Sequence, residues 1–569
     1  MRQPFGPPKR KERDSEDSSQ RSDRTSHRRD VVFFAGKAIC PTATAAMNPG
    51  NTSFTPSSTD SRVLLTLLGL YSFVIFPILR ADQYYNDDLK RALVGHGSWD
   101  ATGRPLTTLL MRMLQAYDPA MVDISPLTQM GAVLILAWTG VLIARRYVFA
   151  SPWIAALAAF PLGAQPFFLE NLSYKFDALS MSLAIFFALL PIVMLGQSRQ
   201  RWWLGIASIF VSLDFYQAAT NAYLVFVILD VLLGQLEGKT PRQLIRQFAS
   251  RALQAGLAML LYQLIIGVHI NGWVRMHSEK IHSLQQLPLV ASNFVDFYTY
   301  VAASFSEQWQ LYFSPILLSM LALPAIVSVR YALRVDVATA RIRVALFAAG
   351  LLTPLAALAC ALGPMLILEK PLFVPRVLIG FGALLAAGLI LAQAALRQWR
   401  VSDKWALAVG GILALGMCVI ASAYGNALRE QKNYETRIAA HLADDLAGLK
   451  GDGIIDTFML DGSAGYSPVT AHVASQFPII YQLISPYLSA EDRFHSHAFL
   501  SYYVSGVTDM RVDESPANLL LISRMLAQTC TVPASYITGA YRVHVIVRTA
   551  VVTFSQAAPE RCDVATAHP

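Results

Sequence analysis

The chain has 569 residues, of which 54% are hydrophobic and only 15% are charged, whereas roughly 25% of the residues in an average soluble domain are charged. Together with a mean hydropathy of +0.42, this composition argues against an ordinary soluble enzyme and favours a protein that crosses a membrane several times. The net charge is +8, but the basic residues lie mostly in short loops between apolar runs, so they do not indicate nucleic-acid binding. Five cysteines exclude a disulfide-dense scaffold, and their spacing matches no structural zinc site.

Residues 1–46 have the composition of a disordered basic tail. The first thirty positions hold nine Lys or Arg and six Asp or Glu, with almost no apolar residues to bury. Met47 follows this stretch and shortly precedes the first apolar run, so it is a candidate for the true start of translation. The apolar run itself is too long for a secretory signal and lacks a small-residue cleavage site.

Residues 47–424 read as a transmembrane catalytic domain with about eleven spans of ~20 residues each. We predict these spans near 62–80, 125–144, 152–169, 178–196, 202–218, 221–236, 252–270, 311–330, 343–363, 373–394 and 404–424. If the N-terminus is cytoplasmic, the inner loops hold Arg145, Arg146, Arg199, Arg201, Lys239, Arg242, Arg246, Arg251, Arg330, Arg334, Arg341, Arg343, Arg397, Arg400 and Lys404. This distribution follows the positive-inside rule. An odd number of spans then places the C-terminal segment outside.

Residues 425–569 change character, because the apolar runs shorten and alternate with turn signals such as "KGDG" and "LDGSAG". We expect a small soluble α/β domain here, with a helix at its entrance, strands in "IIDTFML" and "YRVHVIVRTAVVTF", and a helix in "VTAHVASQFPIIYQLI". Cys530 and Cys562 both belong to this outer domain. A disulfide between them and a pair of free buried thiols are equally open alternatives.

The first outer loop, "RADQYYNDDLKRALVGHGSWDATGRPLTTLLMRML", is unusually rich in charged and aromatic residues. Asp87 and Asp88 follow the first span closely, so their carboxylates are expected just above the lipid headgroups, within reach of a lipid-linked substrate. The alternative, compatible with the first, is that Asn86, Asp87 or Asp88 caps the helix "LKRAL". Arg91 would share their helix face as an ion-pair partner. Trp99 is either an interface anchor or a platform for a sugar ring.

A second polar cluster, "ENLSYKFDALSM", lies at the outer ends of the third and fourth spans. Ionisable residues at this depth are costly unless they face water, a partner or a substrate. The candidate binding residues here are Glu170, Asn171, Tyr174, Lys175 and Asp177. Lys175 is the natural ligand for a phosphate and Asp177 its expected neighbour, with a surface salt bridge as the alternative.

Further polar groups at outer span edges are Tyr216, Gln217 and Arg376, and helix packing could bring them into the same pocket. The motif "HSH" at His495 and His497 lacks further spaced ligands, so a metal site there is disfavoured. Glycines of the last spans, Gly380, Gly382, Gly388, Gly410, Gly411 and Gly416, are expected to permit close helix packing.

The motifs "YYNDDLKRAL", "W…GRPL", "SPL", "ENLSYKFDAL" and "YQAA" occur in this order. Over residues 62–424 the chain thereby resembles the glucosyl transferase type II family, the bacterial membrane glucosyltransferases of the phage serotype-conversion type. The resemblance implies a C-type glycosyltransferase fold, a catalytic acid in the first outer loop and a polyprenyl-phosphate sugar donor. It further implies transfer of glucose or a related hexose from undecaprenyl phosphate to O-antigen, lipopolysaccharide or another surface glycan, on the periplasmic side of the inner membrane.

The residue chemistry agrees with this reaction class. Transfer needs a base for the acceptor hydroxyl, and a partly dehydrated carboxylate at Asp87 or Asp88, with a raised pKa, is the candidate. Arg104, Lys175 and Arg376 lie on the correct side to meet the charge of the leaving phosphate. We expect an oxocarbenium-like transition state and inversion. A divalent cation, Mg²⁺ or Mn²⁺, held by the two carboxylates is compatible with the sequence but not demanded by it.

Two other function classes remain as alternatives. A transporter or flippase for a lipid-linked sugar also needs polar groups among many spans, but it would hold them near mid-bilayer. Here most lie at outer helix ends, with Asp214 as the main exception. A scaffold that assembles a polysaccharide-modifying complex is the third class, and the dense polar first loop speaks against it.

Overall fold

The computed structural model describes residues 57–116, 120–195, 198–270, 272–337, 339–513 and 515–554. The predicted tail at 1–46, the candidate start at Met47 and Cys562 lie outside the described residues. The disulfide between Cys530 and Cys562 therefore stays a prediction.

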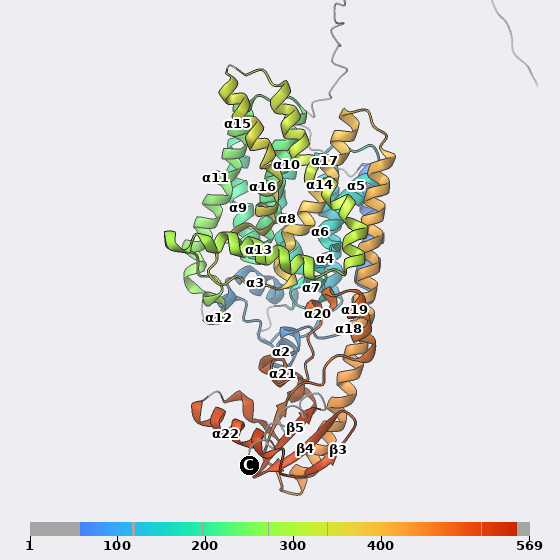
Figure 1. Cartoon of the computed structure of the whole chain (residues 1–569), viewed down its shortest axis with the longest axis vertical. Coiled ribbons are helices and arrows are strands. Elements are labelled where there is room, and N and C mark those ends of the chain that lie inside the picture. The colour runs from blue at the N-terminus through green and yellow to red at the C-terminus, as the bar shows by residue number, and fades with distance from the viewer. Residues whose placement is uncertain are drawn as a thin grey trace, which may run out of the picture. The chain divides into compact units, whose positions relative to one another are not determined.

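Helices dominate the described part of the chain from residue 57 to residue 451 (Figure 1). They are α1 (Ser58–Ala81), α2 (Asp87–Val94), α3 (Pro105–Leu114), α4 (Leu127–Arg146), α5 (Pro152–Ala159), α6 (Pro161–Ala164), α7 (Phe168–Ser173), α8 (Ala178–Leu190), α9 (Arg199–Phe215), α10 (Thr220–Leu236), α11 (Pro241–Ile265), α12 (Gly272–Met276), α13 (Pro288–Ala303), α14 (Glu307–Arg334), α15 (Ala340–Leu351), α16 (Thr353–Leu362), α17 (Ile379–Gln398) and α18 (Lys404–Gly451). Local signals set several starts. Ser57 caps α1 in a reciprocal box with Asp60, and Thr240 does the same for α11 with Gln243.

Seven of the described helices are long and apolar enough to cross a membrane, and an eighth span results if α15 and α16, bent by 48°, count together. The other predicted spans coincide with the shorter apolar segments Pro152–Ala164 and Ala178–Met194 and with α9. The mostly helical, membrane-type architecture is therefore confirmed. The count of eleven spans stays a prediction.

The loops that were expected to be cytoplasmic meet at one end of the helices, which we call the basic end. Arg145, at the end of α4, pairs with Asp60 at the start of α1 (3.0 Å). Arg397, at the end of α17, donates to the carbonyl of Val148 (3.2 Å), and Tyr331 of α14 donates to the carbonyl of Lys239 (2.7 Å). Alternate helix ends therefore share one side, as a positive-inside arrangement requires.

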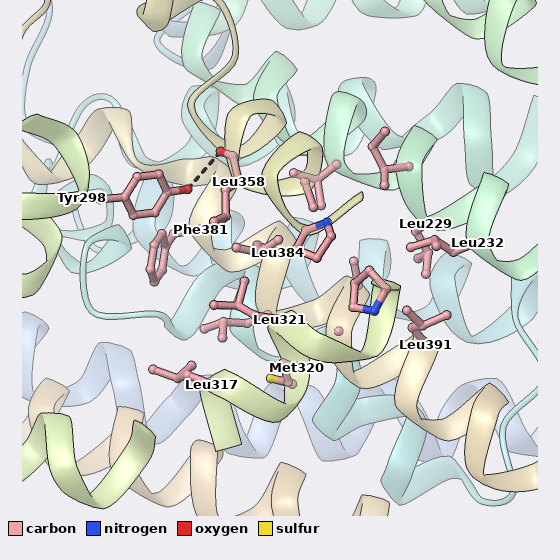
Figure 2. A pocket seen from close by; sticks show the side chains of 18 residues that line it. Leu229, Leu232, Tyr298, Leu317, Met320, Leu321, Leu358, Phe381, Leu384 and Leu391 are labelled. Atoms are coloured by element: carbon pink, nitrogen blue, oxygen red, sulfur yellow. Dashed lines mark hydrogen bonds between the residues drawn. The ribbon is translucent and has the colours of Figure 1, made fainter. Parts of the chain in front are cut away.

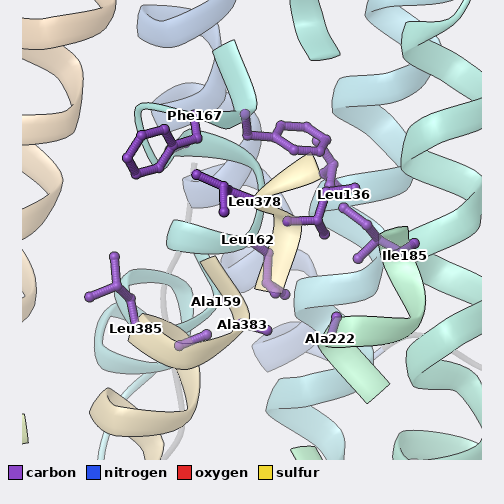
Figure 3. Close-up of a cluster of buried hydrophobic side chains, with 14 of the residues drawn as sticks. Leu136, Ala159, Leu162, Phe167, Ile185, Ala222, Leu378, Ala383 and Leu385 are labelled. Atoms are coloured by element: carbon purple, nitrogen blue, oxygen red, sulfur yellow. The ribbon is translucent and has the colours of Figure 1, made fainter. Parts of the chain in front are cut away.

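A continuous apolar core joins the central helices α4, α5, α6, α8, α10 and α17. Figure 3 shows part of it, with Leu136, Leu162, Ile185, Ala222 and Leu385 drawn from five of these helices. Small residues at the contacts let the helices approach closely, which supplies packing energy where lipid replaces water.

A cavity of about 200 Å³ lies between α10, α14, α16 and α17. Figure 2 shows its almost wholly apolar wall, in which the hydroxyl of Tyr298 is already bonded to the carbonyl of Leu358 (2.9 Å). Its wall includes none of the polar residues singled out in the sequence. This cavity is therefore separate from the polar site described below.

α18 continues without a break through the predicted domain boundary at residue 424 and leads to the sheet. The C-terminal elements are β1 (Thr457–Asp461), α19 (Pro468–Gln476), α20 (Ile479–Leu483), α21 (Arg493–Tyr503), β2 (Thr508–Asp509), α22 (Pro516–Gln528), β3 (Ala534–Ile537), β4 (Tyr541–Ile546) and β5 (Thr549–Phe554). The strand order is β2-β1-β5-β4-β3, parallel on either side of β1 and antiparallel elsewhere. The predicted small α/β fold is confirmed, and its position outside the membrane stays a prediction.

Several contacts among the described residues bind the first outer loop to the C-terminal elements. α2 packs against α21 (Figure 1). The hydroxyl of Tyr487 accepts a hydrogen bond from the backbone N–H of Asn86 (2.7 Å) and donates to the carbonyl of Tyr84 (3.0 Å). The C-terminal elements therefore help to hold the loop that carries the two predicted catalytic aspartates.

Candidate active site

Asp177 is the centre of the polar cluster and is almost fully buried. Its carboxylate accepts hydrogen bonds from Arg91 Nη1 (2.7 Å), Trp99 Nε1 (2.8 Å) and Arg104 Nη1 (3.2 Å). Asp177 directly precedes α8, while its three donors come from the first outer loop. The two polar stretches of the sequence thus form one site.

Asp87 and Asp88 occupy the first turn of α2, with Asn86 at the N-cap position. The side chain of Asn86 donates instead to the hydroxyl of Tyr174 (3.1 Å). Helix capping therefore does not explain the aspartate pair, although acidic residues in a first turn do complement the helix dipole.

The two aspartates lie in different environments. Asp88 has no exposed surface, and its carboxylate accepts the backbone N–H of Lys175 (2.6 Å). Burial raises the pKa of Asp88 to about 8, against the opposing charge of Arg91. The raised pKa that was expected for the base therefore belongs to the aspartate that cannot reach a substrate.

Asp87 is the accessible member of the pair, with 45% of its side chain exposed. Its Oδ2 lies 3.4 Å from Arg91 Nη2 and its Oδ1 lies 3.6 Å from His495 Nε2. Partial burial acts to raise the pKa of Asp87, but the facing imidazole of His495 and the charge of Arg91 outweigh burial and hold the pKa well below its usual value. Asp87 is therefore ionised at neutral pH.

Arg376 anchors the second half of the site. It follows Pro375 in the short turn η7 (Pro375–Val377) and forms an ion pair with the buried Glu170. Its Nη1 also donates to the hydroxyl of Tyr174 (3.1 Å), and its side chain keeps 24% exposure. Because Glu170 also accepts the backbone N–H of Arg376 (2.6 Å), it fixes both the backbone and the guanidinium.

Asn171 and Tyr216 complete this half by bonding to the carbonyl of Arg376, at 3.3 Å and 3.2 Å. The guanidinium of Arg104 lies over the ring of Tyr216, 5.6 Å from its centre. Because Arg104 also donates to Asp177, this contact links Tyr216 and Arg376 to the carboxylate of Asp177. The predicted residues around Glu170 and Arg376 therefore do come together.

Lys175 does not pair with Asp177 as predicted, among the contacts of the described residues. Its Nζ donates to Asp82 (2.5 Å) and to Asp123 (3.2 Å), and it lies over the ring of Tyr84. Successive residues at this turn point in different directions, so Lys175 balances two loop carboxylates instead.

Trp99 has no exposed surface, and its indole ring packs beneath the guanidinium of Arg91 at 4.9 Å. In this arrangement the ring supports the ion-pair cluster and offers no open face to a sugar or to lipid. Gln217 likewise serves the loop, because its Nε2 donates to the hydroxyl of Tyr262 (2.7 Å) and to the carbonyl of Thr102 (3.2 Å).

Asp214 lies at the same end of the helices as the cluster, because its carboxylate accepts the backbone N–H of Leu106 at the start of α3 (3.1 Å). The prediction that Asp214 is the main exception to the polar groups at these helix ends is therefore wrong. A side chain from α9 here satisfies one of the unpaired N–H groups that open a helix.

His495 and Asp492 also belong to the site, because His495 lies 3.6 Å from Asp87 and 2.8 Å from Asp492, but no sequence pattern predicts them as catalytic or binding residues. The "HSH" motif alone indicates no more than a weak metal motif.

Within the described residues, no group of three or more His, Cys, Asp or Glu side chains could hold a metal ion. The oxygens of Asp88 face N–H groups and a guanidinium, which does not fit cation binding, so we derive no step through a metal.

The fold and site define a membrane protein of many helices, with carboxylates and arginines gathered where the helices end. The family model described as "Glucosyl transferase GtrII" matches residues 76–387. The chain therefore belongs to the GtrII glucosyl transferase family, and it is a glycosyltransferase.

A relative from Salmonella phage P22, named "Uncharacterized 55.3 kDa protein in gtrB 5'region", is 26% identical over 435 residues, which cover 75% of this chain and 87% of the relative. No solved structure gives a significant match. The matched segment 76–387 contains all the predicted catalytic and binding residues.

Proposed function

We propose that the protein transfers a glucosyl or related hexosyl group from an undecaprenyl-phosphate sugar to O-antigen, lipopolysaccharide or another surface glycan. The reaction takes place on the periplasmic side of the bacterial inner membrane, in a fold of the C type. The observation that carries this proposal is the half-exposed, ionised carboxylate of Asp87 inside the segment matched by the family.

Asp87 is the base in this proposal, and Asp88 is not. A base must reach the acceptor hydroxyl, either directly or through one water. Asp87 is 45% exposed, whereas Asp88 is buried and bonded to the backbone of Lys175. Asp88 instead shapes the turn between α7 and α8.

Arg376 is the best-placed cation for the donor phosphate. Its side chain remains partly exposed, and the ion pair with Glu170 fixes the orientation of its guanidinium. The side chains of Arg104 and Lys175 are both more buried, and carboxylates already balance their charges. In the proposed step the acceptor oxygen forms a bond to the anomeric carbon and gives its proton to Asp87. The bond from that carbon to the phosphate oxygen breaks, and its electron pair leaves with the phosphate, whose charge Arg376 meets. Because the acceptor oxygen attacks from the face opposite the leaving phosphate, the configuration at the anomeric carbon is inverted.

The side of the membrane follows from the charge pattern. The positive-inside rule makes the basic end cytoplasmic, so the opposite helix ends, with Asp87 and the C-terminal sheet, are periplasmic. Residues 47–424 then form the transmembrane catalytic domain and residues 425–569 a periplasmic domain. Single cysteines introduced at Lys90 and at Arg400 should react with a membrane-impermeant maleimide from opposite sides, and labelling of Lys90→Cys from the cytoplasm would overturn this orientation.

The activity test uses purified full-length protein, radiolabelled undecaprenyl-phosphate glucose and a lipopolysaccharide acceptor. Asp87→Asn should lower transfer by about 10²-fold or more, the range for loss of a general base. Asp88→Asn should keep most of the activity, because the buried acid is largely protonated at neutral pH and Asn has nearly the same shape. Asp100→Asn, at an exposed position of the same loop, is the control. Full activity in a folded Asp87→Asn variant would exclude Asp87 as the base, and lipid movement without sugar transfer would favour a flippase.

A further inference from the structure

His495 of α21 reaches the proposed base from the C-terminal elements. Its Nε2 lies 3.6 Å from Oδ1 of Asp87, and its Nδ1 lies 2.8 Å from Oδ2 of Asp492. The three side chains form a carboxylate–imidazole–carboxylate row that runs from α21 to the first turn of α2. The ring nitrogens thus connect the accessible aspartate to a residue far away in the sequence.

The ring of His495 is held in place from several sides. Asp492 is the N-cap of α21 and also accepts the backbone N–H of His495 (3.2 Å), so one carboxylate fixes both the helix start and the ring. The rings of Tyr487 and Phe494 lie 6.2 Å and 5.2 Å from that of His495. A side chain fixed this way loses little further freedom when it supports a reaction.

The charges around His495 favour its imidazolium form. Asp492 and Asp87 face its two nitrogens, and together they outweigh burial and raise the pKa of His495 to about 9. Two cations lie close to this row: Arg91 pairs with Asp87 (3.4 Å), and Lys90 lies over the ring of Phe494 (4.3 Å). On the α18 side, Glu435 accepts the backbone N–H groups of Tyr487 and Leu488.

We propose that His495 is a positioning residue of the transfer reaction, whose imidazolium, oriented by Asp492, holds the carboxylate of Asp87 toward the acceptor. The proposal rests on the function proposed above. Its consequence is that residues beyond 424 complete the active site.

Two features of the geometry suit this role. The contacts of Asp87 with His495 and Arg91, at 3.6 Å and 3.4 Å, are longer than an ordinary hydrogen bond of 2.7–3.2 Å, so lone pairs of Asp87 remain available to an acceptor hydroxyl. After Asp87 has taken the proton, the neighbouring cations favour its release to water, which returns the base to its starting state.

The test compares His495→Gln, Asp492→Asn and the control His497→Gln by their kcat and KM between about pH 3 and pH 9, a window that includes the ordinary pKa values of Asp and His. His497 lies on the same helix, is 48% exposed and comes only within 3.9 Å of Asp509. His495→Gln should lower kcat by roughly tenfold or more with little change in KM, the pattern for an interaction used in the transition state. The acidic limb of its rate profile should move to higher pH, because Asp87 loses a neighbouring cation. His497→Gln should leave both unchanged.

Asp492→Asn covers the case in which His495→Gln fails to fold, since Asn caps a helix as well as Asp does while removing the charge that orients the imidazolium. It should shift the acidic limb in the same direction by a smaller amount. An inactive Asp87→Asn variant beside folded His495→Gln and Asp492→Asn variants with wild-type kcat and pH profile would overturn the inference but keep the proposed function. An active Asp87→Asn variant would overturn both.

Discussion

Arg91 donates a 2.7 Å hydrogen bond to Asp177, although α4 and the segment from α5 to α7 separate the two residues in the sequence. The same carboxylate also binds Arg104. A buried anion with two cationic donors is costly to remove, because each cation then lies in a dehydrated place without its partner.

Asp177→Asn should therefore destabilise the protein strongly. Breaking a buried pair from one side costs about 3–5 kcal/mol, which should appear as a clearly lower unfolding temperature in detergent. Asp100→Asn, an exposed acid of the same loop, should unfold at the wild-type temperature. Equal unfolding temperatures for the two variants would contradict a structural role for the Asp177 cluster.

Arg376→Lys should weaken the binding of the donor more than it slows the chemistry. The shorter point charge of Lys cannot keep the planar contacts of Arg376 to Glu170 and Tyr174 while also meeting a phosphate. We expect KM for the lipid-phosphate sugar to rise by roughly tenfold, which corresponds to ~1.4 kcal/mol, with KM for the acceptor unchanged. Arg112→Lys, on α3 of the first outer loop, is the control. A rise in acceptor KM alone would assign Arg376 to the other substrate.

The membrane architecture could be predicted because a helix in lipid must be apolar over its whole length, and such runs are plain in the sequence. The polar site could be predicted only as two separate stretches. Its contacts depend on which way each side chain points at the turn between α7 and α8. At this turn the side chain of Asp177 binds Arg91, whereas that of Lys175 binds Asp82. Neither direction follows from spacing.

His495 shows a second limit of sequence reasoning. It lies outside the membrane segment and outside the matched family region, in a motif that has meaning only once α21 is seen beside α2. A local pattern can suggest a ligand or a cap, but a contact between chain segments that are far apart needs the fold.

Glu435 should make stability depend on pH. Burial raises the pKa of this α18 carboxyl to about 8, although two backbone N–H groups favour its charged form. A group whose pKa is raised on folding stabilises the protein fully below the pKa of the unfolded chain, and this stabilisation is lost as the pH rises through the folded value. Wild-type unfolding temperature should therefore fall between about pH 4.5 and pH 8.

Glu435→Gln should flatten this dependence, because the amide keeps the acceptor oxygen and has no charge to bury. Asp88 contributes to the wild-type slope in the same direction, so the difference between wild type and variant isolates Glu435. Thermal unfolding followed by circular dichroism across this pH range measures it. Parallel curves for the two proteins would mean that Glu435 does not retain its proton in the folded state.

Two glycines predicted to permit close helix packing should respond differently to the same substitution. A Cβ on Gly380 of α17 would meet the backbone of Ala361 on α16, whereas around Gly411 of α18 the described residues leave open space within 4 Å. The packing role predicted for Gly411 is therefore wrong for contacts within the chain.

Gly380→Ala should lower the unfolding temperature, because the rigid backbones of α16 and α17 must move apart and the packing that joins the spans is lost. Gly411→Ala should be neutral or slightly stabilising, since Ala favours a helix over Gly by about 1 kcal/mol. The same loss of stability in both variants would contradict the contact between Gly380 and the backbone of Ala361 as the cause of the lower unfolding temperature.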